Sequence, residues 1–312
     1  MEKFDGVVIG AGHNGLTLAA YLARAGLKIA VVERNPRIGG GCTTKESVLP
    51  GFRFNLHSNF FMGLRHSPLI RDLELYRFGF SYIEPSIQQG AVFRDGTCIV
   101  IHKDLDKTCA SLARFSAGDA KTFRELHFLY AVKMRPLFTS IAFNAPLPID
   151  QLKDRLSGAQ AKEFLSHAQH DLFSVVRKHF EDDRIRTLFT SYMHVITTES
   201  VPGAGIVFPL IFANVMEFTL PVGGSASFTD ALARVIEACG GSVINGATSR
   251  KSSCVTAAPS AYTSRMAARS KVAASLRVPS TRPPLCEWPA KTCSRRTCAR
   301  SSMPGTGAIT AW

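Results

Sequence analysis

Acidic residues are almost absent from the end of this chain: residues 249–312 contain a single one, Glu287, and no histidine. The same residues include 11 lysines and arginines, so they carry +10 of the formal net charge of +13 and leave +3 for the rest. A basic surface would ordinarily indicate a nucleic-acid or membrane partner. Because the charge is confined to this tail, we expect that the body of the protein does not bind nucleic acid.

Long apolar runs and targeting signals are also lacking. The longest apolar run, residues 205–216, contains Pro209 and is shorter than the roughly 20 residues of a membrane span. No basic region precedes the first apolar residues, which is unlike a signal peptide. We therefore expect a cytoplasmic protein, with peripheral membrane contact left open, and we interpret residues 205–216 as buried core or as a wall facing an apolar ligand.

Metal-binding patterns are missing as well. Four of the eight cysteines lie in the tail, whereas all nine histidines precede it, so the His/Cys spacing of a zinc site does not arise. We predict no metal site. The 46% hydrophobic residues of this 312-residue chain suffice for one large core or two smaller ones.

A glycine-rich motif stands near the N-terminus. An apolar run at residues 5–9 has the composition of a buried parallel strand, and Gly10, Gly12 and Gly15 follow it in G-x-G-x-x-G spacing. An amphipathic stretch ends at Gly26, and residues 28–33 form a second apolar run. The order of these elements predicts the βαβ unit of a dinucleotide-binding fold.

Each glycine of this motif has a physical purpose. Gly10 permits a tight turn, Gly12 lacks the Cβ that would hold a pyrophosphate away from the backbone, and Gly15 lets the helix pack closely on the strand. Glu33 follows Gly15 by 18 residues, near the spacing of a carboxylate that binds a ribose hydroxyl. Because this carboxylate repels a 2′-phosphate, we predict FAD or NAD rather than NADP.

The residues after Glu33 resemble a known family. Arg37 and the three glycines at 39–41 resemble the R-x-G-G extension of FAD-dependent oxidoreductases of the phytoene desaturase and amine oxidase superfamily. The sequence "PGF" at 50–52, followed by "LHS", resembles the desaturase branch, which includes carotenoid desaturases, carotenoid isomerases and the group of pyridine nucleotide-disulfide oxidoreductase domain-containing protein 2. The resemblance covers residues 4–63 and 217–248, and it implies FAD as the cofactor.

This resemblance implies an α/β fold with a discontinuous Rossmann-type FAD-binding domain and an inserted, mainly helical substrate lobe. The expected domains are residues 1–67 (first FAD-binding segment), 68–216 (substrate lobe), 217–248 (second FAD-binding segment) and 249–312 (basic tail). The expected cofactor-binding residues are Gly10, Gly12, Gly15, Glu33, Arg34, Arg37, Gly39, Gly40 and Gly41.

Within the lobe, residues 90–102 read as a hairpin with Asp95-Gly96 as its turn, and residues 105–139 and 149–197 read as helical. In the second segment, Gly223 and Gly224 precede a helix and then a strand at 242–245. In the family this segment adds a strand to the FAD-binding sheet, and residues 218–224 would line the flavin or substrate side.

The chemistry that the resemblance implies is hydride transfer from an apolar substrate, carotenoid-like or otherwise lipophilic, to flavin. Such a transfer depends mainly on orientation and a dry site, so few titratable groups are needed. His57 and His66 are the nearest candidates for proton transfer, but we interpret both as structural and nominate no catalytic residue. A disulfide reductase would need C-x-x-x-x-C, whereas Cys42 is followed five residues later by Ser47, so we interpret Cys42 as packed near the flavin.

The tail follows neither strand nor helix periodicity. When residues 251–267, "KSSCVTAAPSAYTSRMA", are back-translated and each codon is read from its third base, G/C-rich wobble choices give "IVVRDGRAVGVHLADG". That string has two alternating strands around an Asp-Gly turn, as the family has after its second FAD segment. Our hypothesis is that one nucleotide is missing near codon 248 and that the observed tail is out of frame and disordered.

Two alternatives to the frameshift remain: a basic arm that binds nucleic acid or membrane, and an unusual C-terminal domain. In the family, the C-terminal part supplies a last strand and backbone contacts to the flavin. Without it, we predict an inactive or unstable fragment whose sheet has an exposed edge. The alternative function is a non-catalytic nucleotide-binding or basic interaction protein.

Overall fold

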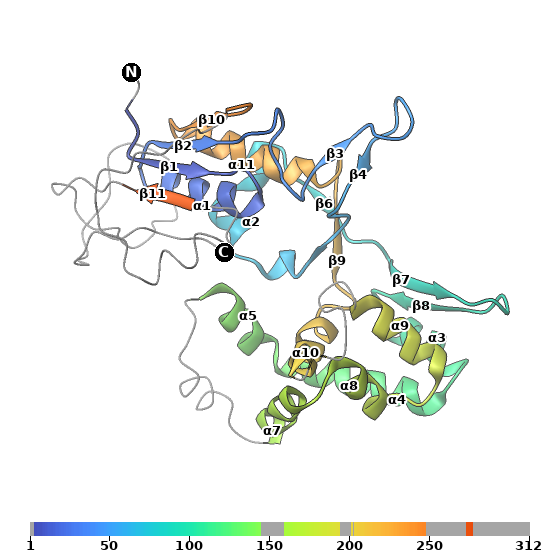
Figure 1. The fold of residues 1–312 in the computed structure, drawn as a ribbon. Coiled ribbons are helices and arrows are strands. Elements are labelled where there is room, and N and C mark those ends of the chain that lie inside the picture. Colours follow the sequence, from blue (N-terminus) through green and yellow to red (C-terminus); the bar gives the residue numbers. More distant parts are fainter. Residues whose placement is uncertain (1–2, 145–158, 194–200, 202, 248–272, 277–312) are drawn as a thin grey trace. The chain divides into compact units, whose positions relative to one another are not determined.

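The computed structural model describes residues 3–144, 159–193, 201, 203–247 and 273–276 (Figure 1). The chain divides into two compact units, of which the first comprises residues 1–61, 68–83 and 220–312 and the second residues 62–67 and 84–219. Residues 68–83 thus belong to the first unit, although the sequence placed the start of the inserted lobe at residue 68.

The first unit contains a four-stranded sheet in the order β10-β2-β1-β11. The strands β1 (Gly6–Ile9), β2 (Ile29–Val32) and β10 (Ser242–Ile244) are parallel, with Val8 opposite Val31 and Val31 opposite Val243. Parallel strands covered by helices carry continuous apolar runs, which is why β1 and β2 could be recognised in the sequence. This is the α/β Rossmann-like arrangement that the glycine motif predicts.

The fourth strand, β11 (Ala273–Leu276), pairs antiparallel with β1, with Val8 opposite Ala274. We predicted no regular structure in the tail, and the structure differs from that prediction at these four residues. The physical reason is that an open edge presents unpaired N–H and C=O groups, which an extended segment of almost any sequence can satisfy. The predicted exposed edge stays a prediction. The tail residues 248–272 and 277–312 lie outside the described part of the chain.

Two helices of the first unit pack against each other. The helix α1 (His13–Arg24) buries Leu16, Ala19 and Ala20, and the helix α11 (Ala226–Ala238) buries Leu232, Val235 and Ile236. Both faces recur at the spacing of three and four residues that puts side chains on one side of a helix. The short helices α2 (Leu69–Asp72) and η2 (Leu75–Phe78) also belong to this unit.

There are two smaller sheets, and only the first of them lies wholly within this unit. In the first, β3 (Thr44–Lys45) pairs antiparallel with β4 (Phe54–Asn55), so residues 46–53 form the turn of a hairpin. The other has the order β5-β9-β6, from β5 (Phe61–Met62), β9 (Phe218–Pro221) and β6 (Tyr82–Ile83).

The second unit begins with the predicted hairpin. It consists of β7 (Ile87–Val92) and β8 (Cys98–His102), which pair antiparallel. At the turn, Gly96 has φ of +81°, and the Asp95 carboxylate accepts hydrogen bonds from the backbone and hydroxyl of Thr97 at 2.9 and 2.6 Å. Asp-Gly supplies both features, so the hairpin prediction is confirmed.

Helices form most of the second unit, as the sequence predicted for its described part; residues 145–158 and 194–200 lie outside that part. They are η1 (Leu64–His66), α3 (Leu105–Ala113), α4 (Ala117–Leu126), the π-helix η3 (His127–Lys133), α5 (Arg135–Phe143), α7 (Ala159–Ser166), η4 (His167–Gln169), α8 (Leu172–His179), α9 (Asp183–Met193), η5 (Ala204–Ile206) and α10 (Val207–Phe212).

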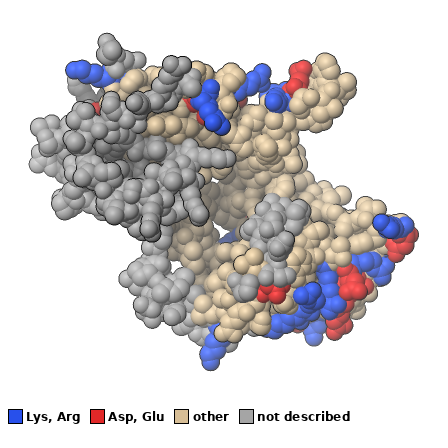
Figure 2. All heavy atoms as spheres, in the orientation of Figure 1, with Lys and Arg blue, Asp and Glu red and all other residues tan. Residues whose placement is uncertain are grey.

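The apolar run at residues 205–216 lies in the core of this unit. In α10, Phe208, Ile211 and Phe212 are buried, and the Phe212 ring lies 5.0 Å from that of Phe123 in α4. The first of our two interpretations, buried core, therefore accounts for these three side chains. The solvent-exposed side of α3, α4 and α9 carries charges of both signs (Figure 2).

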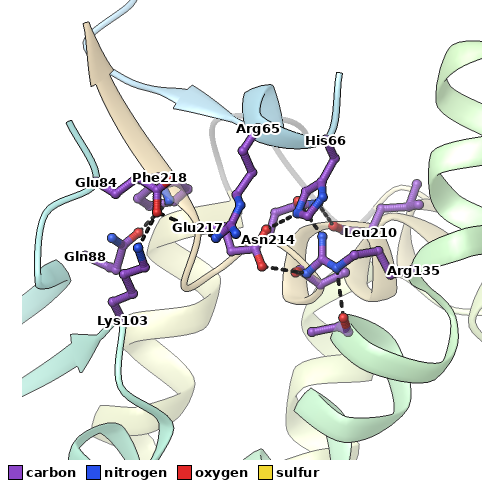
Figure 3. A network of polar contacts seen from close by, with 12 residues as sticks. Arg65, His66, Glu84, Gln88, Lys103, Arg135, Leu210, Asn214, Glu217 and Phe218 are labelled. Carbon is purple, nitrogen blue, oxygen red and sulfur yellow. Dashed lines mark hydrogen bonds and ion pairs between the residues drawn. The ribbon is translucent and has the colours of Figure 1, made fainter. Parts of the chain in front are cut away.

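A network of ion pairs lies inside the second unit (Figure 3). The Glu217 carboxylate accepts a hydrogen bond from Arg135 Nη2 at 3.0 Å and contacts His66 Nε2, and these three side chains are only 18–25% exposed. Arg135 also donates to the carbonyl oxygens of Ala131 at 2.8 Å and Ala213 at 2.5 Å. Burial lowers the pKa of Arg135, and the Glu217 carboxylate opposes that shift.

Replacing Glu217 with alanine is expected to lower the free energy of unfolding by about 1–3 kcal/mol, because a largely buried guanidinium loses its carboxylate partner. Urea denaturation of both proteins measures the difference. The control is Glu125→Ala, which removes an exposed partner 3.9 Å from Lys121 and should cost less than about 0.5 kcal/mol. Equal losses in the two variants would show that the network contributes nothing specific.

Candidate dinucleotide-binding site

The glycine motif forms a tight turn between β1 and α1. Gly10 has φ of +98°, and its N–H donates to the Val32 carbonyl at 2.8 Å, which ties the turn to β2. A Cβ placed on Gly15 would lie 2.2 Å from the Gly10 carbonyl oxygen. The positive φ of Gly10 favours glycine there, and the close backbone contact at Gly15 excludes any larger residue.

Gly12 differs from its neighbours because it borders open space. It is the N-cap of α1 with an ordinary φ of −74°, and a Cβ placed there would meet nothing within 4 Å. The first turn of α1 therefore presents its backbone N–H groups and the positive end of its dipole towards an open region. That combination suits a phosphate group.

Two further glycines pack against this turn. The Gly39 N–H donates to the Ala11 carbonyl at 2.8 Å, and a Cβ on Gly39 would lie 2.5 Å from the Cys42 carbonyl oxygen. Gly40 has φ of +56°, and its Cβ would lie 3.2 Å from the Gly12 Cα. Gly41 has no such constraint, since its Cβ would meet nothing within 4 Å. The R-x-G-G segment thus forms one wall beside the first glycine turn.

Glu33 lies at the end of β2 and is 7% exposed. Its Oε2 accepts a hydrogen bond from the Ala11 N–H at 2.8 Å, and its Oε1 accepts from the backbone N–H and the side-chain Nδ2 of Asn35 at 2.9 and 2.7 Å. A carboxylate oxygen can accept about two hydrogen bonds, so Oε1 is satisfied and Oε2 retains one acceptor position. The carboxylate is therefore held in a fixed orientation with room for one more donor.

A cavity of about 920 Å³ is lined by Asn35, the residue that donates two hydrogen bonds to this carboxylate; Glu33 itself is not among the lining residues. Its lining contains four basic side chains and one acidic side chain, in addition to polar and small residues. The lining residues are Asn35, Pro36, Arg37, Gly40, Thr43, Lys45, Glu46, Arg53, Leu56 and His57. The volume is within the range of small-molecule sites, and the excess of cations favours an anionic ligand.

The structure brings most of the predicted site residues together. Arg37 and Gly40 line the cavity, whereas Arg34 is exposed and is not among the lining residues. Sequence reasoning missed Asn35, Lys45 and Arg53. Asn35 could have been noticed as a short amide two residues after Glu33, a spacing that allows a local side-chain hydrogen bond. Lys45 and Arg53 depend on the hairpin's folding back on itself and had no signal.

Neither histidine considered in the sequence lies in a catalytic arrangement. His57 lines the cavity as an exposed side chain, and His66 contacts Glu217 in the second unit. In the segment predicted from the sequence to be the second FAD-binding segment, Gly224 has φ of +90°, and its Cβ would lie 2.5 Å from the Thr44 side chain. Its positive φ and the close approach of the Thr44 side chain therefore explain that glycine.

Cys42 is 3% exposed, and burial raises the pKa of its thiol. A neutral, buried thiol is a poor nucleophile, which fits a packing role better than a redox role. At pH 8 we expect iodoacetamide to label Cys42 at least about tenfold more slowly than the less buried Cys98 of β8. Peptide mapping by mass spectrometry over time measures both rates in one sample. Comparable rates would contradict the packing role.

Metal clusters and membrane-spanning helices are both absent from the described part of the chain. Among the residues that the structure describes, no group of three or more His, Cys, Asp and Glu side chains could hold a metal ion. Over the same residues, no helix has the length and apolar character needed to cross a membrane.

Known proteins resemble this chain in sequence. Residues 8–74 match the family described as NAD(P)-binding Rossmann-like domain. A limonene dehydrogenase polypeptide from Castellaniella defragrans is 34% identical over 237 residues, which cover 74% of this chain and 42% of that protein. Pyridine nucleotide-disulfide oxidoreductase domain-containing protein 2 of Rattus norvegicus is 27% identical over 282 residues, which cover 80% of this chain and 48% of that protein. The chain belongs to the FAD/NAD(P)-binding Rossmann oxidoreductases of the amine oxidase and phytoene desaturase superfamily.

Membership of this superfamily confirms the resemblance drawn from Arg37 and the glycines that follow it. Among solved structures, cyclohexylamine oxidase from Brevibacterium oxydans IH-35A matches with a TM-score of 0.50 and 18% identity, covering 78% of this chain and 51% of that one. At this identity the match shows the fold alone. The chain spans about half the length of the superfamily relatives that it matches.

Proposed function

We propose that the first unit binds FAD and that the chain represents part of an oxidoreductase that transfers hydride from a lipophilic substrate to the flavin. The observation that carries the proposal is the Glu33 carboxylate, which is buried, fixed by Ala11 and Asn35, and left with one acceptor position beside the Gly12 turn. A ribose hydroxyl is the donor that this position fits.

The residues present fit a dinucleotide at two places. The open space at Gly12, in front of the first turn of α1, would take the pyrophosphate, and the Glu33 carboxylate would take the adenosine ribose. When bound, the flavin would supply the hydride acceptor. The contribution of the chain is to hold and orient the dinucleotide, with Arg37 in the cavity lining supplying charge for an anionic group.

An apolar substrate is supported by a relative and by composition. The relative from Castellaniella defragrans is named for the dehydrogenation of limonene, and 46% of the residues of this chain are hydrophobic. No titratable group within the cavity lining is arranged with a partner as a nucleophile or base would be, which fits hydride transfer driven by orientation.

The test of cofactor identity is titration of the purified 312-residue chain with FAD, ADP, NAD and NADP by calorimetry, together with its visible absorbance spectrum. Binding of FAD and ADP with exclusion of NADP supports the proposal. Preference for NAD over FAD would support a dinucleotide-binding site but contradict FAD as the cofactor. If none of the four nucleotides binds, the proposed site is wrong.

We further infer that residues from about 249 onwards are read out of frame and that the chain as written has no flavin-dependent turnover. The sequence matches leave a fifth to a quarter of this chain uncovered, which agrees in size with the tail. Sequencing the gene across codons 240–312 tests the first statement, since restoring a single lost base would recover the frame encoding "VVRDGRAVGVHLADG". Turnover by the purified chain would contradict the second.

The tail's +10 charge favours one other function, a non-catalytic interaction protein. Retention on a polyanion column that disappears when residues 249–312 are removed would support it. Retention unaffected by that deletion would exclude the tail as a binding arm.

A further inference from the structure

The turn of the β3–β4 hairpin exposes large apolar side chains that no described part of its own unit covers. Val48, Leu49 and Phe52 are 81%, 52% and 59% exposed, and Phe54 at the start of β4 is 42% exposed. Every residue from 45 to 54 is exposed. Scattered apolar residues on a surface need no explanation, but a cluster within one short segment usually marks an interaction site.

The turn is held in shape by its backbone rather than by apolar packing. The Phe52 N–H donates to the Leu49 carbonyl at 3.1 Å, with Pro50 second in the turn and Gly51 third at φ of +82°. This is the pattern of a type II turn, in which proline and glycine fit those two positions. The Glu46 carboxylate also accepts from the Gly51 N–H at 3.1 Å. The apolar side chains are therefore presented by a preformed loop.

Basic side chains flank this apolar tip. Lys45 and Arg53 lie on the two arms of the hairpin, and the Glu46 carboxylate between them is engaged with the turn backbone. In the space-filling view, uncharged atoms form the end of the projection at the place of this hairpin, with blue and red atoms nearer its base (Figure 2). An apolar end with cations behind it matches a bilayer whose headgroups are anionic.

We propose that residues 48–52 insert into the interface of a bilayer containing anionic lipids, with Lys45 and Arg53 at the headgroup level. A protein partner fits less well, since a stable protein interface takes about 20–30 residues a side and this tip is a single short turn. A few apolar side chains and two cations are enough for reversible membrane contact. Lys45 and Arg53 also line the cavity beside Asn35, so the proposal is tested on the chain without added cofactor.

Insertion is tested directly by depth-dependent fluorescence quenching on the full chain. Phe52→Trp is compared with Val92→Trp, because Val92 is 83% exposed at the end of β7 in the other hairpin. In both proteins the two natural tryptophans are replaced, Trp288→Phe and Trp312→Phe. The vesicles contain mostly brominated phosphatidylcholine, with phosphatidylglycerol as the anionic lipid. We expect these vesicles to quench the fluorescence of the tryptophan at position 52 and to leave that of the tryptophan at position 92 unchanged. Equal quenching at the two positions, or none at position 52, would overturn the proposal.

Binding strength is tested by vesicle sedimentation with Val48→Asp/Phe52→Asp, and with Val92→Asp as the matched control. The double variant is expected to lower the partition coefficient about 100-fold, the loss expected when two apolar side chains can no longer be buried. Val92→Asp should change it less than about twofold. Circular dichroism of each variant establishes that the fold is retained.

The same sedimentation assay distinguishes the contribution of the hairpin's two cations to vesicle binding from that of the basic tail. Lys45→Gln/Arg53→Gln is expected to weaken binding about 30-fold on anionic vesicles and to leave binding to pure phosphatidylcholine unchanged. The basic tail is present in every variant, so its own attraction to the vesicles cancels in these comparisons. If all variants bind anionic vesicles as the parent does, the tail alone is responsible and the hairpin proposal is wrong.

Discussion

Gly15→Ala is expected to destabilise the first unit by about 3 kcal/mol or more, at the upper end of the cost of overpacking. The reason is that the new methyl group would lie 2.2 Å from the Gly10 carbonyl oxygen, and a backbone atom has little freedom to move away. Thermal or urea denaturation followed by far-UV circular dichroism measures the loss. The free protein suffices for this measurement, so it does not depend on finding the ligand.

The matched control is Gly12→Ala, three residues earlier in the same turn. Its methyl group would enter open space at an ordinary φ, so we expect a change in stability within about 1 kcal/mol. The same methyl group would occupy the space proposed for the pyrophosphate, so we expect binding of FAD and ADP to be lost. If Gly12→Ala binds ADP as the parent does, the pyrophosphate does not lie at Gly12. If both variants unfold equally, the two glycines do not have the separate roles assigned here.

The second large effect is expected from Glu33→Ala. Removing the carboxylate takes away the proposed ribose acceptor, and a hydrogen bond to a charged group contributes about 1.5–3 kcal/mol, or about 10- to 150-fold in affinity. Calorimetric titration with ADP measures this for the half of the cofactor that Glu33 would contact. The Ala11 N–H also loses its side-chain acceptor, so some loss of stability accompanies the loss of affinity.

Glu46→Ala serves as the control, because Glu46 is the acidic residue among those that line the cavity beside Asn35, and it is exposed. Its removal should change ADP affinity less than about threefold, and in the direction of tighter binding, since a negative charge leaves a site for an anion. Unchanged affinity in Glu33→Ala would remove Glu33 from the site. A larger loss in Glu46→Ala than in Glu33→Ala would place the ribose in the cavity near Glu46 and not at Glu33.

The parts of the fold that could be predicted from the sequence are those fixed by local constraints. Gly10, Gly12 and Gly15 follow a strand and open a helix. Gly10 and Gly15 each have a geometric requirement that neighbours in the chain reveal, whereas Gly12 borders open space. The Asp95-Gly96 turn is of the same kind, because a positive φ and a side-chain hydrogen bond are both local. In each case the residue type and the backbone conformation determine one another over a few positions.

The parts that could not be predicted depend on contacts between distant residues. His66 and Glu217 are 151 positions apart, and nothing in either segment indicates the other. Lys45 and Arg53 meet at the cavity only because β3 and β4 pair, and those strands have two residues each, too short for a periodic pattern. The strand β11 lies in a stretch without any periodicity, so no pattern in the sequence indicates its pairing with β1.

The pairing of β11 with β1 has a consequence for how selective this sheet is. The strand β1 pairs with the parallel strand β2 on one side and with the antiparallel four-residue segment β11 on the other, so its backbone groups accept partners of both directions. A site with so little discrimination is open to competition from any other extended chain, including the same segment of a neighbouring molecule. We therefore expect refolding yield to fall as protein concentration rises, and an excess of a short peptide with the β11 sequence to restore it.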